Sequence, residues 1–481
     1  MNGTSVFDYD LAIIGSGGGA FAAAIRATNL GKRVLMVERG TVGGTCVNTG
    51  CIPSKALLAA AEVRHVAMDA PGRFAGISTS AAPVEMAELI EAKRLLVETM
   101  RAEKYVDLAA DYGWEIRHGT AVFTGKPSEP FLEITGPDGS STRVSAEHYL
   151  VATGSAPWIP PVQGLADVEY LTSTSAMELD ELPHSMLVLG GGYVALEQAQ
   201  LFARLGTRVT MIVRSRLAST EEPEAAHALM GVFADEGIRV VPWATLASIR
   251  TDLASGEVVA IADVSGGQEE FRAARVLIAT GRRPVTEELN LDVVGVKTGD
   301  RGEILVQNTL RSTNPRIWAA GDVTGHPEFV YVAAAHGTLM VENAFNEAGR
   351  DVDYRHLPRV TFTSPALAAV GMTDKEANQA GIRCTCRVLP LEYVPRALVN
   401  RDTRGFIKIV ADADTGRILG ITAVGKEAGD IAAAGVYILE AGMSVEQVAN
   451  LWSPYLTMAE GIKITAQSFT TDVSKLSCCA A

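Results

Sequence analysis

The chain has 481 residues, of which 47% are hydrophobic and 20% charged, a composition typical of a soluble globular protein with about three domains. Its net charge of -14 argues against nucleic acid or an anionic membrane as the main partner, although backbone amides can still hold nucleotide phosphates. No apolar run is long enough to cross a membrane, and the first residues carry no secretory signal. Six cysteines in so long a chain indicate a reducing compartment, so we expect a cytoplasmic protein.

The chain opens with a dinucleotide-binding fingerprint of the form G-x-G-x-x-A. An apolar strand at 9–14 precedes it, a helix to about Leu30 follows, and a second strand at 33–37 ends in Glu38. The first glycine makes the turn, the second lets the backbone approach a pyrophosphate, and the alanine packs the helix on the strand. These positions are held by Gly15, Gly17 and Ala20. Because an acid about twenty residues on accepts hydrogen bonds from ribose hydroxyls, the pattern predicts a nucleotide site.

Two cysteines, Cys46 and Cys51, follow in the stretch from Gly43 to Lys55. The flanking glycines allow tight turns, and Pro53 favours the first turn of a helix. Cysteines at this spacing at a helix start can close a strained, easily reduced disulfide, and a helix N-terminus favours the thiolate. The stretch therefore predicts a redox-active pair, with a structural disulfide or two buried thiols as the alternatives.

The middle of the chain repeats the opening pattern. Residues 84–111 have helical spacing, a strand at 149–154 ends in a glycine turn, and the proline-rich stretch 155–164 indicates a domain crossover. A strand at 185–189 then leads into a second fingerprint, which is followed by a helix to about Leu205. The fingerprint positions are held by Gly190, Gly192 and Ala195.

The strand after the second fingerprint, at 208–213, ends in Arg214-Ser215-Arg216 rather than in an acid. Basic residues there suit a 2′-phosphate, which a carboxylate would repel. We therefore expect Arg214 and Arg216 to select NADPH, unless they only solvate a loop.

The last third of the chain has a different pattern of expected strands and helices. Strand-and-glycine segments recur at 276–283 and 317–322, so one nucleotide module lies inside the other. From about Tyr354, alternating segments at 406–410 and 418–424 predict antiparallel strands. With a helix at 428–441, the sequence predicts an α/β protein in which two nested Rossmann-like domains precede a C-terminal α+β domain.

Together and in this order, the motifs resemble the pyridine nucleotide-disulfide oxidoreductases over essentially the whole chain. The motifs are the two fingerprints, the cysteine pair, Ala279-Thr280-Gly281-Arg282 and Ala320-Gly321-Asp322. The resemblance implies a glutathione reductase-like fold and a homodimer whose active sites use residues from both subunits. The implied domains are 1–155 and 285–353 for FAD, 156–284 for NADPH and 354–481 for dimerisation.

The resemblance also implies roles for single residues. Cys51 would be a charge-transfer thiolate against the flavin, and Cys46 the exchanging thiol. Lys55 and Glu197 would pair beside the flavin, and Tyr193 would cover it until nicotinamide displaces the ring. A surface turn, a solvated helix position and simple packing are the respective alternatives for these three. Further implied cofactor contacts are Asp322, Gly44, Thr45 and Gly154 for FAD and Gly281 for NADPH.

The C-terminal region departs from the thiol-reducing members of the family. These carry His-Pro-Thr with a glutamate five residues after the histidine, whereas here Thr457 and Glu460 keep their places and Tyr455 replaces the histidine. No histidine follows His356. Because a phenol with a pKa of about 10 is a poor proton shuttle at neutral pH, reduction of a disulfide substrate is disfavoured.

Adjacent cysteines, Cys478 and Cys479, stand at the end of the chain. Two thiolates there can capture a soft ion such as Hg(II) and pass it on. With Tyr455, this pair resembles the members of the family that reduce Hg(II). We therefore expect NADPH-dependent reduction of a Hg(II)-thiolate, in which the ion passes from the terminal pair of one subunit to Cys46 and Cys51 of the other.

Two alternatives stay open. One is a disulfide or dihydrolipoyl reductase with another proton donor, and the other is a protein that sequesters mercury without turnover, which would not need two nucleotide sites. The chain begins almost at the flavin strand, so the N-terminal metal-binding domain of many mercury-reducing members is expected to be absent. Cys384 and Cys386 lie on a predicted strand and are interpreted as structural, although a C-x-C pair could bind metal.

Overall fold

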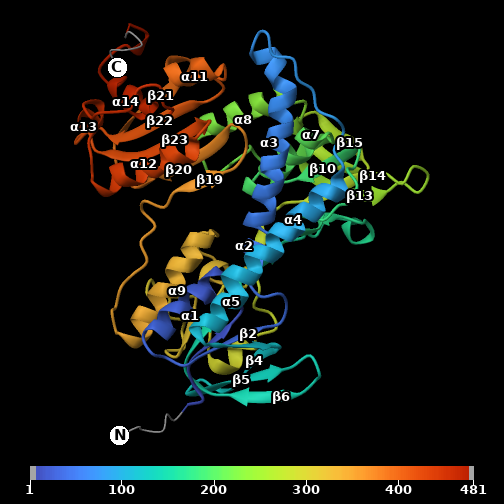
Figure 1. Ribbon diagram of the computed structural model, residues 1–481, viewed down its shortest axis with the longest axis vertical. Helices are drawn as coiled ribbons and strands as arrows, with labels where there is room; N and C mark the ends of the chain where they lie inside the picture. Colours follow the sequence, from blue (N-terminus) through green and yellow to red (C-terminus); the bar gives the residue numbers. More distant parts are fainter. Residues whose placement is uncertain (1–6, 476–481) are drawn as a thin grey trace. The chain divides into compact units, whose positions relative to one another are not determined.

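The computed structural model describes residues 7–475, which form two compact units (Figure 1). The first unit takes in the described residues up to Ala56, together with Glu88–Trp158 and Gly281–Val352. The second takes in Leu57–Ala87, Ile159–Thr280 and the described residues from Asp353 onward. In this described part of the chain, no helix has both the length and the apolar character needed to cross a membrane.

The first unit is built on a parallel five-stranded sheet with the order β18-β7-β1-β2-β3. Its strands are β1 (Tyr9–Ile14), β2 (Val34–Glu38), β3 (Glu115–His118), β7 (Ala146–Val151) and β18 (Ile317–Ala319). Helix α1 (Gly18–Asn29) packs closely against α9 (Val330–Phe345). Glycine at position 337 allows this approach, because a Cβ atom there would lie 2.1 Å from the Gly19 carbonyl oxygen. These helices lie together in Figure 1.

Smaller elements complete the first unit. An antiparallel sheet has the order β4-β5-β6, and β8 pairs with β17. The bounds are β4 (Thr120–Lys126), β5 (Glu129–Thr135), β6 (Ser141–Val144), β8 (Ser155–Pro157) and β17 (Arg282–Pro284). Helices α2 (Gly44–Asn48) and α5 (Asp107–Tyr112) belong here with a π-helical turn at Ala102–Val106. Helix α4 (Met86–Arg101) belongs here from Glu88 onward, and α3 (Cys51–Arg73) begins here and continues into the second unit.

The second unit contains another parallel sheet, with the order β12-β11-β10-β16-β9. Its strands are β9 (Leu171–Thr172), β10 (Ser185–Leu189), β11 (Arg208–Ile212), β12 (Arg239–Val241) and β16 (Arg275–Ile278). Helix α7 (Tyr193–Leu205) follows β10, and α8 (Pro223–Asp235) follows β11. An antiparallel sheet joins β13 (Thr245–Thr251), β14 (Val258–Val264) and β15 (Gly267–Ala273).

The remainder of the second unit is an antiparallel sheet with the order β19-β20-β23-β22-β21. Its strands are β19 (Arg359–Thr361), β20 (Ala366–Gly371), β21 (Cys384–Pro390), β22 (Phe406–Asp412) and β23 (Ile418–Gly425). Helix α12 (Ala428–Glu440) packs on β20 and β23. Shorter helices are α6 (Ser173–Ala176), α10 (Asp374–Gln379), α11 (Pro395–Asn400), α13 (Val445–Ala449) and α14 (Glu460–Gln467).

Most predicted elements are confirmed, including both fingerprint strands, the helices after them and the antiparallel C-terminal strands. The segment 276–283 differs, since it forms two strands, β16 and β17, with a turn between them. The first unit gathers both segments expected to bind FAD, but residues 57–87 belong to the second unit instead. The four-part domain division stays a prediction.

Candidate active site

The first fingerprint turn is built for close approach of a ligand to the backbone. Gly15 has a φ of +101°, and a side chain there would lie 2.4 Å from the Ala152 carbonyl oxygen. A side chain at Gly44 would come within 2.5 Å of the Gly17 Cα. Gly17 caps α1 without any side-chain hydrogen bond, and Ala20, in the first turn of the helix, is fully buried. The helix N-terminus therefore presents backbone N–H groups, as a pyrophosphate requires.

One buried hydroxyl joins the fingerprint turn to the neighbouring segments. Ser16 donates to the Glu38 carboxylate at 2.6 Å and accepts from the Gly43 N–H at 3.1 Å. Glu38 also accepts from the Gly40 N–H at 2.7 Å. The carboxylate is thereby fixed at the end of β2, where a ribose acceptor is expected. Sequence reasoning missed Ser16, because the second position of the fingerprint carries no required residue type.

The cysteine pair lies directly after this turn. Cys46 is in α2, Cys51 is the first residue of α3, and both are half-buried and present as thiols. A hydrogen bond with Cys51, and then burial, raise the pKa of the Cys46 thiol, while the charge of Lys55 acts in the opposite direction. The raised pKa favours the protonated form of Cys46, and Cys51 stands at the helix N-terminus, which favours a thiolate.

Tyr105 is a neighbour of the pair that the sequence did not indicate. Its ring packs edge-on against Phe21 at 4.8 Å between centroids. Burial, and then the charges of Cys46 and Cys51, raise the pKa of the Tyr105 phenol. No sequence signal could have found it, since Tyr105 lies in the π-helical turn of a charged helical stretch.

A second polar arrangement in the first unit surrounds Asp322. Its carboxylate accepts from the Ser155 hydroxyl at 2.7 Å, and that hydroxyl accepts from the Arg282 Nε at 2.7 Å. The preceding N–H, of Gly321, donates to the His336 Nδ1 at 3.1 Å. The predicted Asp322 is therefore held in place from both sides. Two other predicted contacts, Thr45 in α2 and Gly154 after β7, lie in the same unit.

The second fingerprint repeats the first turn in the second unit. A side chain at Gly190 would lie 2.2 Å from the Ala279 carbonyl oxygen. Gly192 caps α7 without a side-chain hydrogen bond, and Ala195 is fully buried. The N-terminus of α7 is therefore also suited to a pyrophosphate. Gly281 belongs to the first unit, so its predicted contact with NADPH stays a prediction.

The two arginines after β11 have different surroundings. Arg214 is exposed at the end of the strand. The guanidinium of Arg216 instead donates to carbonyl oxygens of its own loop, including those of Ala218 at 3.1 Å and Ser219 at 3.0 Å. Arg216 therefore shapes the loop, and it could reach a phosphate only by giving up these bonds.

Glu197 and Tyr193 lie on the first two turns of α7. Glu197 is 7% exposed and accepts from the Phe362 N–H at 2.9 Å. Tyr193 is half-buried, and its hydroxyl donates to Glu221 at 2.7 Å. Lys55 belongs to the first unit, so its pairing with Glu197 stays a prediction.

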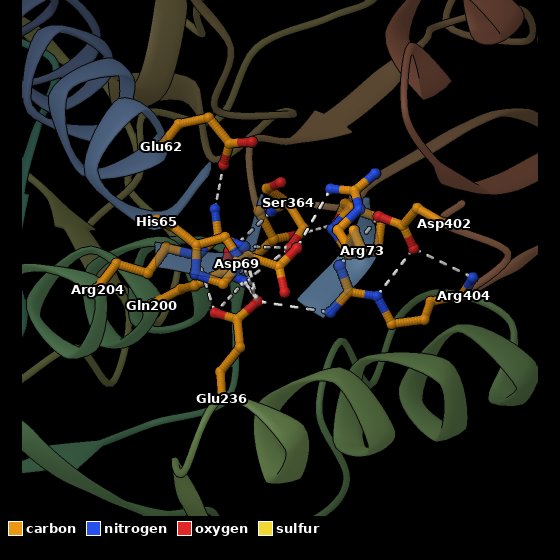
Figure 2. Close-up of polar contacts among 12 residues, drawn as sticks. Glu62, His65, Asp69, Arg73, Gln200, Arg204, Glu236, Ser364, Asp402 and Arg404 are labelled. Atoms are coloured by element: carbon orange, nitrogen blue, oxygen red, sulfur yellow. Dashed lines mark hydrogen bonds and ion pairs between the residues drawn. The ribbon is translucent and has the colours of Figure 1, made fainter. Parts of the chain in front are cut away.

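The far end of α7 holds the segment that contacts Glu197. Figure 2 shows that Gln200 and Arg204 both converge on Ser364. The Ser364 carbonyl accepts from both side chains at 2.8 Å, and its N–H donates to Gln200 at 2.7 Å. Arg204 is paired in turn with Glu236, Nε to Oε2 at 2.8 Å. The helix face thus fixes the segment that positions Glu197.

The C-terminal loop holds the predicted Tyr455. Its side chain is 49% exposed, and the next N–H, of Leu456, donates to the buried Glu460 carboxylate at 3.1 Å. Thr457 accepts from the Glu460 N–H at 3.2 Å. The spacing of Thr457 and Glu460 therefore has a structural role, which is to fix the loop that presents Tyr455. Cys478 and Cys479 lie outside the described residues.

Cys384 and Cys386 lie on the edge strand β21. Burial, and then Cys384, raise the pKa of Cys386 to about 12, which favours its protonated form. Among residues 7–475, no group of three or more histidines, cysteines or acids is arranged to hold a metal ion.

The two glycine-rich turns on parallel sheets and the thiol pair beside the first turn define a flavoprotein disulfide reductase fold. Residues 9–337 match the family described as pyridine nucleotide-disulphide oxidoreductase, and residues 357–466 match its dimerisation domain. The chain belongs to this family of oxidoreductases, which use a flavin and a pyridine nucleotide. The glutathione reductase-like fold predicted from the sequence is confirmed.

Several relatives are similar over nearly the whole chain. A mercuric reductase of Streptomyces lividans is 58% identical over 98% of both chains. One from Staphylococcus aureus is 44% identical over 98% of this chain and 84% of its own. Among solved structures, LpdA from Mycobacterium tuberculosis has a TM-score of 0.85 at 25% identity, covering 96% of this chain and 99% of that one. The HOCl-induced flavoprotein disulfide reductase RclA from Escherichia coli has a TM-score of 0.83 at 26% identity, with 95% and 99% covered.

Proposed function

We propose that the protein is an NADPH-dependent flavoenzyme that reduces Hg(II) to elemental mercury in the cytoplasm. The observation that carries the proposal is the C-terminal substitution: Tyr455 stands where thiol-reducing members have their proton donor, and Cys478 and Cys479 follow at the end of the chain. The similarity to mercuric reductases over nearly the full length supports it.

The two glycine-rich turns fit FAD and NADPH. The first has an ordered ribose acceptor in Glu38, and Asp322 is available in the same unit for the flavin's ribityl chain. The second has the exposed Arg214 in place of an acid, which suits a 2′-phosphate. When bound, the nicotinamide and the flavin supply the two electrons that the reaction needs.

The thiols handle the metal by ligand exchange. Hg(II) arrives with two small thiolates, and each exchange forms one bond from mercury to a cysteine sulfur and breaks one to a departing thiolate. Linear two-coordinate binding by Cys478 and Cys479, and then by Cys46 and Cys51, suits this soft ion. Because the pKa of Cys46 is raised, this thiol carries a proton into the exchange, and the proton leaves on the displaced thiol. Two electrons then convert the bound Hg(II) to the neutral atom, which departs and leaves two thiolates.

We propose that Tyr193 and Tyr455 line the site at which Hg(II) is transferred. A phenol can assist exchange without becoming a third strong ligand, which would trap Hg(II). Lys55 and Glu197 would tune the flavin as a pair.

A homodimer completes this proposal. The unit that includes the matched dimerisation domain exposes large apolar side chains, among them Tyr437 at 75% and a fully exposed Trp452. We propose that a second copy of the chain covers these side chains in the homodimer.

The deciding experiment measures NADPH oxidation by the flavin-loaded protein with Hg(II) in excess small thiol, and in parallel with oxidised glutathione and with lipoamide. We expect oxidation that depends on Hg(II) and releases volatile mercury. The variant Cys478→Ala/Cys479→Ala should lose most of this activity at low Hg(II) and keep flavin reduction by NADPH. Oxidation that depends on a disulfide, with Hg(II) only inhibiting, would instead identify a disulfide reductase. Stoichiometric Hg(II) binding without NADPH oxidation would identify a sequestering protein.

A further inference from the structure

The Tyr193 hydroxyl donates its hydrogen bond to a buried carboxylate rather than to solvent. Tyr193 is the first residue of α7, directly after the glycine-rich turn, so its ring stands at the pyrophosphate end of the nucleotide site. Its hydroxyl donates to the Glu221 Oε1 at 2.7 Å and lies 3.3 Å from the Thr220 Oγ1. The ring is therefore held by a directed bond as well as by packing.

Glu221 is itself clamped by an arginine from a distant segment. The Nε of Arg359 lies 2.8 Å from one Glu221 oxygen, and its Nη2 lies 2.9 Å from the other. The Glu221 side chain is 2% exposed and that of Arg359 is 22% exposed. Burial would raise the pKa of Glu221, but the bonds and charge of Arg359 outweigh it and keep this pKa below its usual value. The two-point contact leaves the carboxylate ionised and in one orientation.

The backbone that carries Glu221 is also fixed. The Glu221 N–H donates to the Ala218 carbonyl at 2.9 Å, and Arg216 donates to the Ala218 and Ser219 carbonyls of the same loop. Neither the carboxylate nor its loop can readily follow the tyrosine ring. Any rotation of Tyr193 away from this position must therefore break its bond to Glu221.

We infer that Glu221 and Arg359 form a latch on the Tyr193 hydroxyl, and that the nicotinamide half of the coenzyme binds at the start of α7 only when the bond between Tyr193 and Glu221 breaks. This inference rests on the proposed binding of NADPH at the second glycine-rich turn, which Tyr193 directly follows. Burial, and then the charge of Glu221, raise the pKa of Tyr193 to about 12, so the phenol stays a neutral donor across the working pH range. Displacement by the nucleotide, and not a pH change, opens the latch.

The latch should weaken the binding of nucleotides that contain nicotinamide and leave the binding of other nucleotides unchanged. If only the unlatched fraction of the protein can accept the nicotinamide ring, the apparent Kd for the whole nucleotide is raised by the reciprocal of that fraction. A hydrogen bond to a charged acceptor makes that factor about tenfold. A ligand without nicotinamide, such as 2′,5′-ADP, does not displace the ring and is unaffected.

The test measures the Kd of NADP⁺ and of 2′,5′-ADP by calorimetry on the flavin-loaded, full-length protein. Tyr193→Phe should tighten NADP⁺ about tenfold and Glu221→Gln about threefold, because a neutral amide is a weaker acceptor, with 2′,5′-ADP unchanged in both. In the Tyr193→Phe background, Glu221→Gln should add nothing. Thr220→Ala is the matched control, since it removes only the longer contact and should leave both affinities unchanged.

Arg359→Lys tests the clamp itself, because it keeps the charge but loses the two-point contact; it should tighten NADP⁺ to the same degree as Glu221→Gln. Arg359→Ala is avoided, since it would leave a buried carboxylate unpaired. Equal shifts for NADP⁺ and 2′,5′-ADP, additive effects of the two substitutions, or weaker NADP⁺ binding would each overturn the latch.

The same variants separate this inference from the proposed function. If NADP⁺ affinity stays unchanged while the unmodified protein oxidises NADPH in response to Hg(II), the latch is wrong and the function stands. If the affinities shift as expected but Hg(II) drives no oxidation, the latch stands and the function is wrong.

Discussion

Acidification should weaken the first unit through His336. This side chain is fully buried in α9, and its Nδ1 accepts the N–H of Gly321, next to Asp322. Burial, and then the neighbouring His326, lower the pKa of His336 from its ordinary 6.5 to about 4. As the pH falls below about 6.5, His336 therefore becomes protonated in the unfolded chain but stays neutral in the folded protein. The contribution of neutral His336 to the free energy of unfolding is present in full above this pH and is lost as the pH falls toward 4.

The difference between the two pKa values corresponds to about 3 kcal/mol in full, and about 2 kcal/mol of it is lost between pH 7 and pH 5. The variant His336→Asn isolates the effect, because an amide oxygen can accept the same N–H but does not titrate. We expect the urea midpoint of flavin release, followed by flavin fluorescence, to fall more steeply with acidification in the unmodified protein than in the variant. His148, whose pKa is also lowered to about 4, titrates in both proteins and so cancels. Parallel pH profiles would refute the assignment to His336.

Three further predictions concern the other unit and the substrate. Arg204→Met should cost about 2–3 kcal/mol, since it removes the two-point ion pair of the nearly buried Glu236 and leaves only Gln200 and the more distant Arg404 and His65 beside that carboxylate. Glu62→Gln, at a carboxylate 42% exposed, should cost under about 1 kcal/mol, and comparable shifts in the urea midpoint would contradict this ranking. Arg214→Glu should lower the ratio of kcat/KM for NADPH over NADH at least about tenfold, and an unchanged ratio would remove Arg214 from coenzyme selection. Tyr455→Phe should slow Hg(II) turnover more than it slows flavin reduction by NADPH in stopped-flow measurements, and equal slowing would exclude a role in metal transfer.

The sequence predicts the parts of this fold that depend on local pattern. Both glycine-rich turns, Glu38 at the end of β2 and the helix start at Cys51 lie where residue spacing placed them. Local pattern does not show which distant segments meet. Glu221 and Arg359 are separated by more than a hundred residues, and neither belongs to a recognisable motif, so their clamp on Tyr193 became visible only in the folded chain.

The expectation that Arg216 selects NADPH likewise rested on local sequence alone. A basic residue two positions after Arg214 suits a phosphate by type, but the sequence cannot show that the loop carbonyls already bind its guanidinium. Likewise, chain order cannot show that residues 57–87 cluster with the second unit, and the predicted domain division stays a prediction.

Attempts to re-engineer the coenzyme preference would therefore meet two unequal arginines. Replacement of Arg214 changes a solvent-facing charge and leaves the backbone intact. Replacement of Arg216 removes the donors that close the 217–222 loop, and it would disturb the backbone that carries Glu221. In a library that varies both positions together, a change in coenzyme recognition could not be told apart from a displaced loop. Arg214 is the position at which evolution or design can change the coenzyme preference without disturbing the backbone.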